Sequence, residues 1–378
     1  MSDDSGGANA SNPLVQVHAA GQSLWLDFIQ KSLLDGELQR LIREDRIMGL
    51  TSNPSIFEQA IAKTDEYDAH LARLLEAHPE ATELELFEHL AIEDIRAAAD
   101  VFRDVWERTD GLDGMVSLEV VPELAHDAAG TVDMAVALAK RVDRPNLMIK
   151  VPGTEAGVTA FEEIIARGIN VNVTLLFGVP RYREIAQAYI RGLERRRGDG
   201  HSIERLASVA SFFVSRVDSA VDAALEANGS PEAMALRGKV AIANAKAAYG
   251  HALNLFGSPQ FEALAKGGAR PQRLLWASTG TKNPDYSDVV YVEELIGRDT
   301  VNTLPPKTLE AFRDHGTAEP RLERGLDEAQ ATLDALGELG IDLGEITAKL
   351  EADGIDSFAD AFDRLMAALA EERAKVAS

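Results

Sequence analysis

Short apolar runs rich in branched residues recur along the whole chain, and a helical pattern of about a dozen residues or more follows each run. This alternation is typical of parallel βα units. Eight runs are predicted to be strands, at residues 24–28, 47–51, 115–120, 147–151, 171–175, 207–213, 274–278 and 301–304. Eight such units with right-handed crossovers close into a parallel barrel, so the sequence predicts an α/β fold, a (β/α)8 TIM barrel.

The alternative is a doubly wound sheet, which usually has fewer strands and a glycine-rich first turn. No Gly-x-Gly-x-x-Gly follows the first run, which favours the barrel. Two connections are long, at about residues 55–113 and 217–273, and both carry helical periodicity. We expect them to form additional helices on the rim.

The two ends of the chain differ in character. Residues 1–14 are mostly small and polar and lack the order of a signal peptide, so they are predicted to be a disordered tail. Residues 15–378 are predicted to be a single barrel domain that includes C-terminal helices from about residue 307.

Two segments near the C-terminus, Asp342–Glu345 and Ser357–Asp360, resemble helix capping boxes or their acidic variants. An apolar helical face follows, made of Phe358, Phe362, Leu365, Met366 and Leu369. The pattern predicts a helix packed on the outside of the barrel. A coiled coil or a partner-binding helix is the alternative.

Charge and cysteine content exclude several functions. The 378 residues carry a formal net charge of -24, which opposes binding to nucleic acids and anionic membranes. A phosphorylated substrate therefore requires a local group of cations. The chain has no cysteine, which removes disulfides and thiolate chemistry and fits a cytoplasmic protein. No run of 18 apolar residues that would span a bilayer occurs.

Catalytic groups of such barrels lie at the C-terminal ends of strands. Polar residues stand there on most of the predicted strands, namely Asp27, Thr51, Asn53, Glu119, Lys150, Asn172, Thr174 and Ser211, with Phe213 beside them. A lysine amine that is buried among apolar neighbours loses solvation of its charged form and becomes a nucleophile toward carbonyls. Lys150 is the candidate, with Asp27 and Glu119 as neighbouring carboxylates.

Each candidate also has a structural interpretation. Lys150 fits a lysine that extends to solvent or pairs with a carboxylate, and Asn53 fits a helix cap before Pro54. Polar residues on the fifth and sixth strands fit satisfied groups inside the barrel, and Phe213 fits the core. Three carboxylate and amine groups at one barrel end would stabilise a core poorly, however, which favours catalysis.

Arg216, after the sixth strand, and Lys282, in the segment Ser-Thr-Gly-Thr-Lys-Asn after the seventh, are candidates for binding phosphate. Taken singly, both fit ordinary surface charges. The histidines are scattered, without His-Glu-x-x-His or His-x-His, so no metal site is predicted.

Several long motifs resemble the transaldolase family: Gly49-Leu-Thr-Ser-Asn-Pro-Ser, Ser117-Leu-Glu-Val, Asn146-Leu-Met-Ile-Lys-Val-Pro-Gly-Thr-Glu-Ala-Gly, Asn170-Val-Asn-Val-Thr-Leu-Leu-Phe and Ala210-Ser-Phe-Phe-Val-Ser-Arg-Val-Asp. They follow one another on successive predicted strands between about Asp27 and Lys307. The resemblance implies a cofactor-free enzyme of carbohydrate metabolism that acts on small sugar phosphates. It also implies a class I aldolase-type barrel.

The resemblance implies that Lys150 forms a Schiff base with a ketose phosphate, fructose 6-phosphate or sedoheptulose 7-phosphate. Glu119 then assists dehydration through a water that Thr174 orients, and Asp27 takes the proton of the C4 hydroxyl. A dihydroxyacetone unit passes to erythrose 4-phosphate or glyceraldehyde 3-phosphate. The family's donor-hydroxyl positions match Asn53, Asn172 and Ser211, and a position near the phosphate matches Arg216. We group Thr51 and Phe213 with the substrate-binding residues.

Lys282 departs from the pattern, because the family's phosphate-binding arginine is expected there. Related segments are sometimes fused to a phosphoglucose isomerase, and this chain is expected to be monofunctional, as a monomer or small homo-oligomer. The rivals are a fructose 6-phosphate aldolase and a non-catalytic sugar-phosphate-binding barrel. In the aldolase branch, glutamine and tyrosine tend to replace Glu119 and Phe213, so the sequence favours transaldolase.

Overall fold

The computed structural model describes residues 11–376. Its eight strands form a closed barrel in chain order, and β8 pairs with β1 in parallel. The strands are β1 (Gln22–Asp27), β2 (Ile47–Thr51), β3 (Met115–Glu119), β4 (Leu147–Pro152), β5 (Val171–Leu176), β6 (Ser208–Phe213), β7 (Arg273–Ala277) and β8 (Thr300–Leu304). Each has its ends within two residues of the predicted ones. The predicted (β/α)8 TIM barrel is confirmed.

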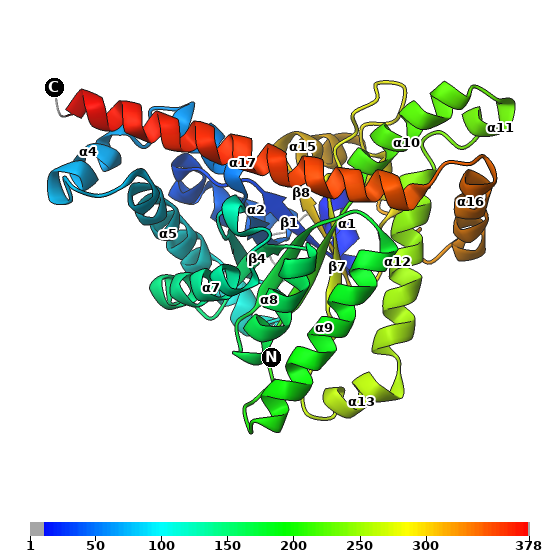
Figure 1. The fold of residues 1–378 in the computed structure, drawn as a ribbon, viewed down its shortest axis with the longest axis horizontal. Coiled ribbons are helices and arrows are strands. Elements are labelled where there is room, and N and C mark those ends of the chain that lie inside the picture. The colour runs from blue at the N-terminus through cyan, green and yellow to red at the C-terminus, as the bar shows by residue number, and fades with distance from the viewer. Residues whose placement is uncertain (1–10, 377–378) are drawn as a thin grey trace.

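Helices surround the barrel (Figure 1). Those of the short connections are η1 (Leu33–Glu37), α2 (Leu38–Asp45), η3 (Pro122–Leu124), α7 (Ala128–Val142), α8 (Glu155–Ala166), α9 (Val179–Gly198) and α14 (Val290–Glu294). The two long connections carry additional helices, as predicted: α3 (Pro54–Phe57), η2 (Glu58–Ala62), α4 (Asp68–Ala77), α5 (Glu83–Val101) and α6 (Arg103–Arg108), then α10 (Ser215–Asn228), α11 (Pro231–Met234), α12 (Val240–Phe256) and α13 (Pro259–Ala265).

The N-terminal part of the chain contains a helix before the first strand. Helix α1 (Pro13–Ala19) begins within the segment predicted to be a disordered tail, residues 1–14. The Asn12 side chain caps it by accepting a hydrogen bond from the Leu14 amide, and Leu14 is fully buried. The prediction was therefore wrong for the last two residues of that segment, and residues 1–10 lie outside the described ones.

The C-terminal helices are α15 (Pro306–His315), α16 (Leu326–Glu338) and α17 (Leu343–Val376). Asp342 caps α17 by accepting a hydrogen bond from the Glu345 amide, at 3.2 Å. The second predicted cap was wrong, because Ser357–Asp360 lies inside this one continuous helix. The apolar face is confirmed, since four of its five members are buried: Phe358, Phe362, Leu365 and Leu369.

The sequence predicted that α17 packs on the outside of the barrel, without specifying which surface this helix covers. Helix α17 crosses the C-terminal end of the strands (Figure 1), where it contacts α3, α5, α10 and the end of β5. A Cβ at Gly354 would lie only 3.0 Å from Leu175 Cδ2, so this glycine lets the helix approach the barrel closely. Hydrophobic periodicity identified the buried face, but it carries no information about which surface that face covers.

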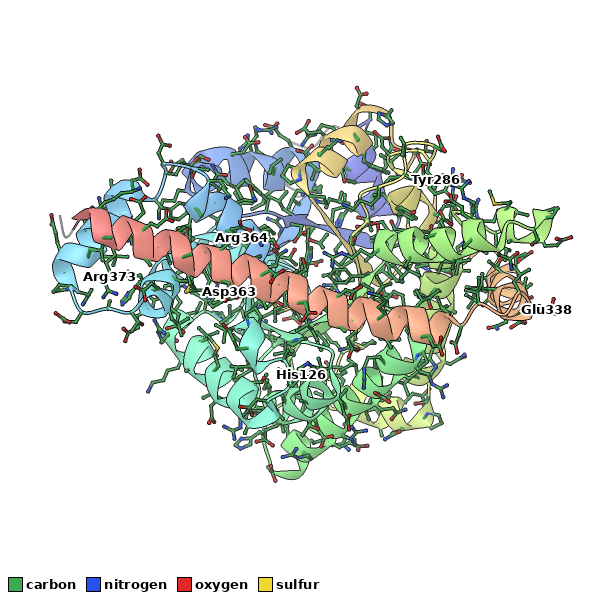
Figure 2. All side chains as sticks on the ribbon, turned by 45° about the horizontal axis from the view of Figure 1, so that its top comes forward. His126, Tyr286, Glu338, Asp363, Arg364 and Arg373 are labelled. Carbon is green, nitrogen blue, oxygen red and sulfur yellow. The ribbon has the colours of Figure 1, made fainter. Side chains whose placement is uncertain are left out.

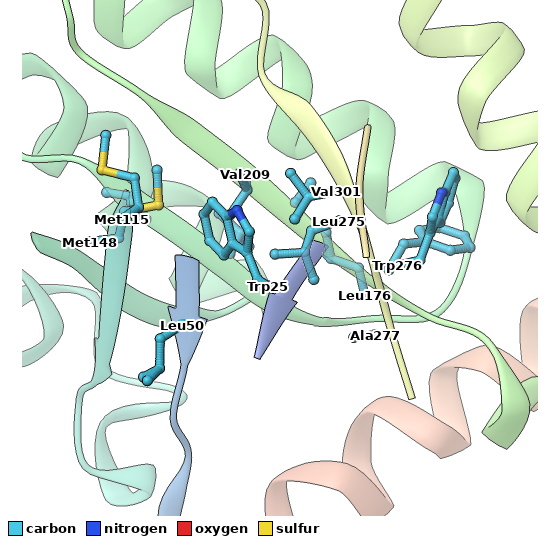
Figure 3. Packing of buried hydrophobic residues seen from close by; sticks show 14 of the residues in the cluster. Trp25, Leu50, Met115, Met148, Leu176, Val209, Leu275, Trp276, Ala277 and Val301 are labelled. Atoms are coloured by element: carbon cyan, nitrogen blue, oxygen red, sulfur yellow. The ribbon is translucent and has the colours of Figure 1, made fainter. Parts of the chain in front are cut away.

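Side chains alternate along each strand, so residues two apart share a face. A layer of apolar side chains fills the barrel two or three residues before the C-terminal ends of three strands. It contains Trp25, Leu275 and Val301, and Figure 3 shows them gathered among the strands. A Cβ at Gly49 would lie 2.7 Å from the Trp25 indole, so the neighbouring strand needs a glycine there. This buried layer fills the barrel and supports the polar groups above it.

A buried polar network closes the lower, N-terminal end of the barrel. The Asp113 carboxylate accepts hydrogen bonds from Ser23 Oγ (2.7 Å), Trp25 Nε1 (3.1 Å) and Arg273 Nη2 (3.0 Å). Asp113 is 2% exposed and Arg273 is 8% exposed. Because its charges are paired and its polar atoms hydrogen-bonded, the network joins β1, β7 and the start of β3 without leaving an isolated charge.

Replacing Asp113 should destabilise the protein strongly, because the Asp113→Ala variant leaves the Arg273 guanidinium buried without its carboxylate. We expect a loss of about 3–5 kcal/mol in the free energy of unfolding, measured by denaturant titration. The control is Asp353→Ala, which removes an exposed ion pair with Lys349 and should cost less than about 1 kcal/mol. Equal losses in the two variants would contradict this view of the network.

Candidate active site

Lys150 is the centre of a polar cluster at the C-terminal end of the barrel. Strand β4 carries it, and it is only 4% exposed. Its Nζ lies 3.0 Å from Glu119 Oε2 on the adjacent strand β3 and donates a hydrogen bond to the Ser52 carbonyl oxygen, also at 3.0 Å. The register of the two strands pairs Glu119 with Lys150 directly, which fixes the carboxylate beside the amine.

Asp27, at the end of β1, lies in the same cavity as Lys150. The Thr51 hydroxyl donates a hydrogen bond to Asp27 Oδ1, at 2.6 Å, and lies 2.7 Å from Thr303 Oγ1. Three strands therefore meet around one carboxylate. The Thr51 hydroxyl orients it within the cavity.

Burial governs the protonation of both carboxyl groups. Loss of solvation raises the pKa of Asp27, and the Lys150 ammonium and the Thr51 hydroxyl oppose that effect. Loss of solvation also raises the pKa of Glu119, which the Lys150 ammonium again opposes. Two carboxyl groups with raised pKa values beside one buried amine are typical of a site that transfers protons.

A chain of buried hydrogen bonds supports the cluster from β5 and β6. Ser211 Oγ donates to Asn172 Oδ1 at 2.7 Å, and Asn172 Nδ2 donates to Ser117 Oγ at 3.2 Å. Thr174, on β5, is fully buried, and its hydroxyl forms no hydrogen bond with the described residues. A buried hydroxyl without a partner costs free energy, so Thr174 Oγ1 marks a position suited to a water or ligand atom.

Two cations line the cavity. Arg216, near the start of α10, places its guanidinium 5.3 Å from the centre of the Phe213 ring. Lys282 is exposed, in the loop after β7. The Tyr286 hydroxyl anchors this loop by donating a hydrogen bond to Asp222 on α10, at 2.6 Å, and Figure 2 shows Tyr286 at the rim beside α10. Within residues 11–376, neither cation forms an ion pair.

A cavity of about 240 Å³ brings most of the predicted site residues together. Its lining includes Asp27, Thr51, Asn53, Lys150, Thr174, Ser211, Phe213, Arg216 and Lys282. Glu119 and Asn172 are not part of the lining, but they contact Lys150 and Ser211 directly. Asn53 also caps α3, because its side chain accepts a hydrogen bond from the Ile56 amide at 3.0 Å. The same residue therefore caps a helix and lines the cavity.

Several further residues that line the cavity were not predicted from the sequence, among them Ser55, Ser278, Gly280, Thr303, Pro305 and Phe358. Thr303 had a detectable signal, because it is a polar residue near the C-terminal end of a predicted strand. Phe358 had none, since it belongs to a helix whose position the sequence did not reveal. Within the described part of the chain, no group of three or more His, Asp and Glu side chains is arranged to hold a metal ion. No helix among residues 11–376 is long and apolar enough to cross a membrane.

Comparisons with known proteins find similarity over nearly the whole chain. The family described as Transaldolase/Fructose-6-phosphate aldolase matches residues 24–369. A protein of Thiobacillus denitrificans named Transaldolase is 52% identical over 352 residues, which cover 93% of this chain and 98% of the relative. Proteins of the same name from Mycobacterium bovis and Mycolicibacterium smegmatis are 46% and 47% identical, each covering 94% of this chain and 96% of the relative.

Arg216 and Lys282 are expected to form an anion-binding site, and inorganic phosphate is a suitable probe of it. Phosphate binding, measured by isothermal titration calorimetry, should weaken about tenfold or more in Arg216→Ala, because a charge-assisted hydrogen bond is lost. A smaller loss is expected in Lys282→Ala, since that side chain is exposed. The control, Arg103→Ala, removes a partly exposed arginine outside the cavity and should not change binding. Unchanged phosphate affinity in Arg216→Ala would contradict the assignment.

Proposed function

The chain belongs to the transaldolase/fructose-6-phosphate aldolase family, and from that premise we propose that it is a transaldolase with its Schiff base on Lys150. The observation that carries the proposal is the buried Lys150 amine, 3.0 Å from Glu119 and in one cavity with Asp27. The donors are ketose phosphates, sedoheptulose 7-phosphate or fructose 6-phosphate. The acceptors are aldose phosphates, glyceraldehyde 3-phosphate or erythrose 4-phosphate.

Schiff-base formation starts when the free amine of Lys150 attacks the C2 carbonyl of the donor. The resulting carbinolamine loses water, which requires a proton for the departing hydroxyl. Glu119 is in place to supply it through a water, because its carboxyl group lies beside the reacting nitrogen. The unpartnered hydroxyl of Thr174 supports a role in orienting that water. The product is an iminium ion, which accepts electrons from the neighbouring bond.

Carbon–carbon cleavage follows when Asp27 removes the proton of the C4 hydroxyl. The C4 oxygen then forms a carbonyl, the C3–C4 bond breaks, and its electron pair moves to the iminium nitrogen. The aldose phosphate leaves, and a dihydroxyacetone enamine remains on Lys150. An acceptor aldehyde enters, the same steps run in reverse, and the free amine is restored. The lysine provides the electron sink, so the reaction requires no cofactor.

The remaining side chains have binding roles in this proposal. Asn53 and Ser211 hold donor hydroxyls, and Asn172 supports Ser211 by a hydrogen bond. Thr51 orients Asp27. Phe213 forms part of the cavity wall. Arg216 and Lys282 bind the phosphate, and they provide the local positive charge that a chain of net charge -24 requires. We place the reaction in the cytoplasm, in keeping with a chain without cysteine.

Borohydride trapping tests the proposed nucleophile. Reduction in the presence of fructose 6-phosphate should leave a dihydroxyacetone-sized adduct on Lys150, located by intact mass and peptide mapping. Lys150→Ala should give no adduct, and Glu119→Gln should form it about 10²- to 10⁴-fold more slowly, because proton transfer is lost. A folded wild-type protein that gives no adduct would refute the mechanism. Release of free dihydroxyacetone at the same rate with and without an acceptor would identify an aldolase instead.

The acidic limb of the pH–rate profile should follow Asp27, which must be ionised to act as a base. Burial raises its pKa, and the Thr51 hydrogen bond opposes this rise. Thr51→Val removes that hydrogen bond, so the pKa of Asp27 should rise further and the acidic limb should move to higher pH by about 0.5–1 unit. Thr303→Val is the control, because Thr303 contacts Thr51 and not Asp27. A shift toward lower pH in Thr51→Val would contradict the role of Asp27.

A further inference from the structure

Phe358 is a residue of the C-terminal helix that reaches the reacting nitrogen. The centre of its ring lies 5.7 Å from Lys150 Nζ, and the side chain is only 5% exposed. Phe358 is the one residue of α17 that lines the Lys150 cavity within the described chain. The helix therefore places an aromatic ring against the amine, whereas the cations Arg216 and Lys282 line the same cavity from other elements.

Ion pairs hold α17 across the barrel on both sides of Phe358. Toward the C-terminus, Arg364 forms two hydrogen bonds with the Glu58 carboxylate, at 2.9 and 3.0 Å, and Arg373 pairs with Glu83 at 2.8 Å. Figure 2 shows Arg364 and Arg373 along the helix as it crosses this face. Toward the N-terminus, Glu351 lies 3.5 Å from Arg181 of α9.

Close packing fixes the depth of the helix beside Phe358. Gly354, one turn before Phe358, faces Leu175, the residue after Thr174 in β5. One turn after Phe358, the Phe362 ring packs edge-on against Phe87, with 5.5 Å between ring centres. Phe358 is thus held over the cavity from both adjacent turns, and it has little room to move away from Lys150.

We propose that Phe358 shields the Lys150-bound enamine from water, and so determines that the dihydroxyacetone unit passes to an aldehyde acceptor and is not released by hydrolysis. This inference rests on the proposed function. An apolar cover that excludes water from a reactive intermediate suppresses its hydrolysis. The ring also lies at a distance at which an aromatic face attracts a cation, which suits the iminium form.

The competing hydrolysis has a simple balance. The enamine carbon takes a proton and forms a C–H bond, which converts the enamine to the iminium ion. A water molecule then adds to C2, the C2–N bond breaks, and a carbonyl forms as the protons redistribute. The net reaction consumes one water and yields free dihydroxyacetone and the free amine of Lys150. Both steps require water or its proton near the nitrogen that Phe358 covers.

The test compares free dihydroxyacetone release with acceptor-dependent transfer in the same reaction, using fructose 6-phosphate and erythrose 4-phosphate. In Phe358→Ala, the ratio of release to transfer should rise about tenfold or more, which corresponds to about 1.4 kcal/mol in relative barrier height. Phe358→Leu keeps an apolar cover of similar reach, so its ratio should stay close to that of the wild type. Circular dichroism and thermal unfolding establish that both variants are folded.

Leu369→Ala is the control, because Leu369 is a buried apolar residue on the same helix, 1% exposed, about three turns after Phe358, and does not line the Lys150 cavity. Its ratio should not change. An unchanged ratio in Phe358→Ala, or an equal rise in Leu369→Ala, would overturn the role of Phe358 and leave the Schiff-base mechanism intact. A wild-type protein without a trapped lysine adduct would overturn the proposed function and this inference together.

Discussion

The structure depends on the burial of one amine and two carboxyl groups at the same end of a β-barrel. Removing charges from water costs several kcal/mol for each ion, and a core of apolar side chains would be as stable or more stable. The Lys150–Glu119 pair and the nearby Asp27 are therefore retained at an energetic cost. The proposed Schiff base on Lys150 accounts for this cost, because such a reaction needs a poorly solvated amine and proton donors and acceptors beside it.

The rest of the molecule keeps this cluster in place. The alternation of side chains along each strand puts a layer containing Trp25 directly beneath Asp27, and the Asp113–Arg273 network closes the opposite end of the barrel. Helix α17 covers the reactive end, and its ion pairs with the rim hold Phe358 against Lys150. In the mechanism that we propose, a rigid barrel and a tightly attached cover together limit the water that reaches the Lys150 amine.

The order of the strands and the residues at their ends could be predicted from the sequence. The period-two alternation of apolar residues and the regular succession of strands and helices specify them. The positions of Lys150, Glu119 and Asp27 at strand ends make them candidates from the residues alone. The place of α17 was not accessible, since an apolar stripe is the same whether a helix covers the wall or the mouth of a barrel. Phe358 was consequently missed, although its burial was predicted, and Thr303 was overlooked despite its strand-end position.

The central claim is that the buried amine of Lys150 becomes covalently bound to the donor beneath Phe358. A crystal structure of the protein soaked with fructose 6-phosphate in the absence of an acceptor tests it most directly. The account predicts continuous density from Lys150 Nζ to C2 of a three-carbon unit, with the Phe358 ring over the nitrogen. Sugar phosphate bound in the cavity without a covalent bond to Lys150, or linked to a different lysine, would contradict it.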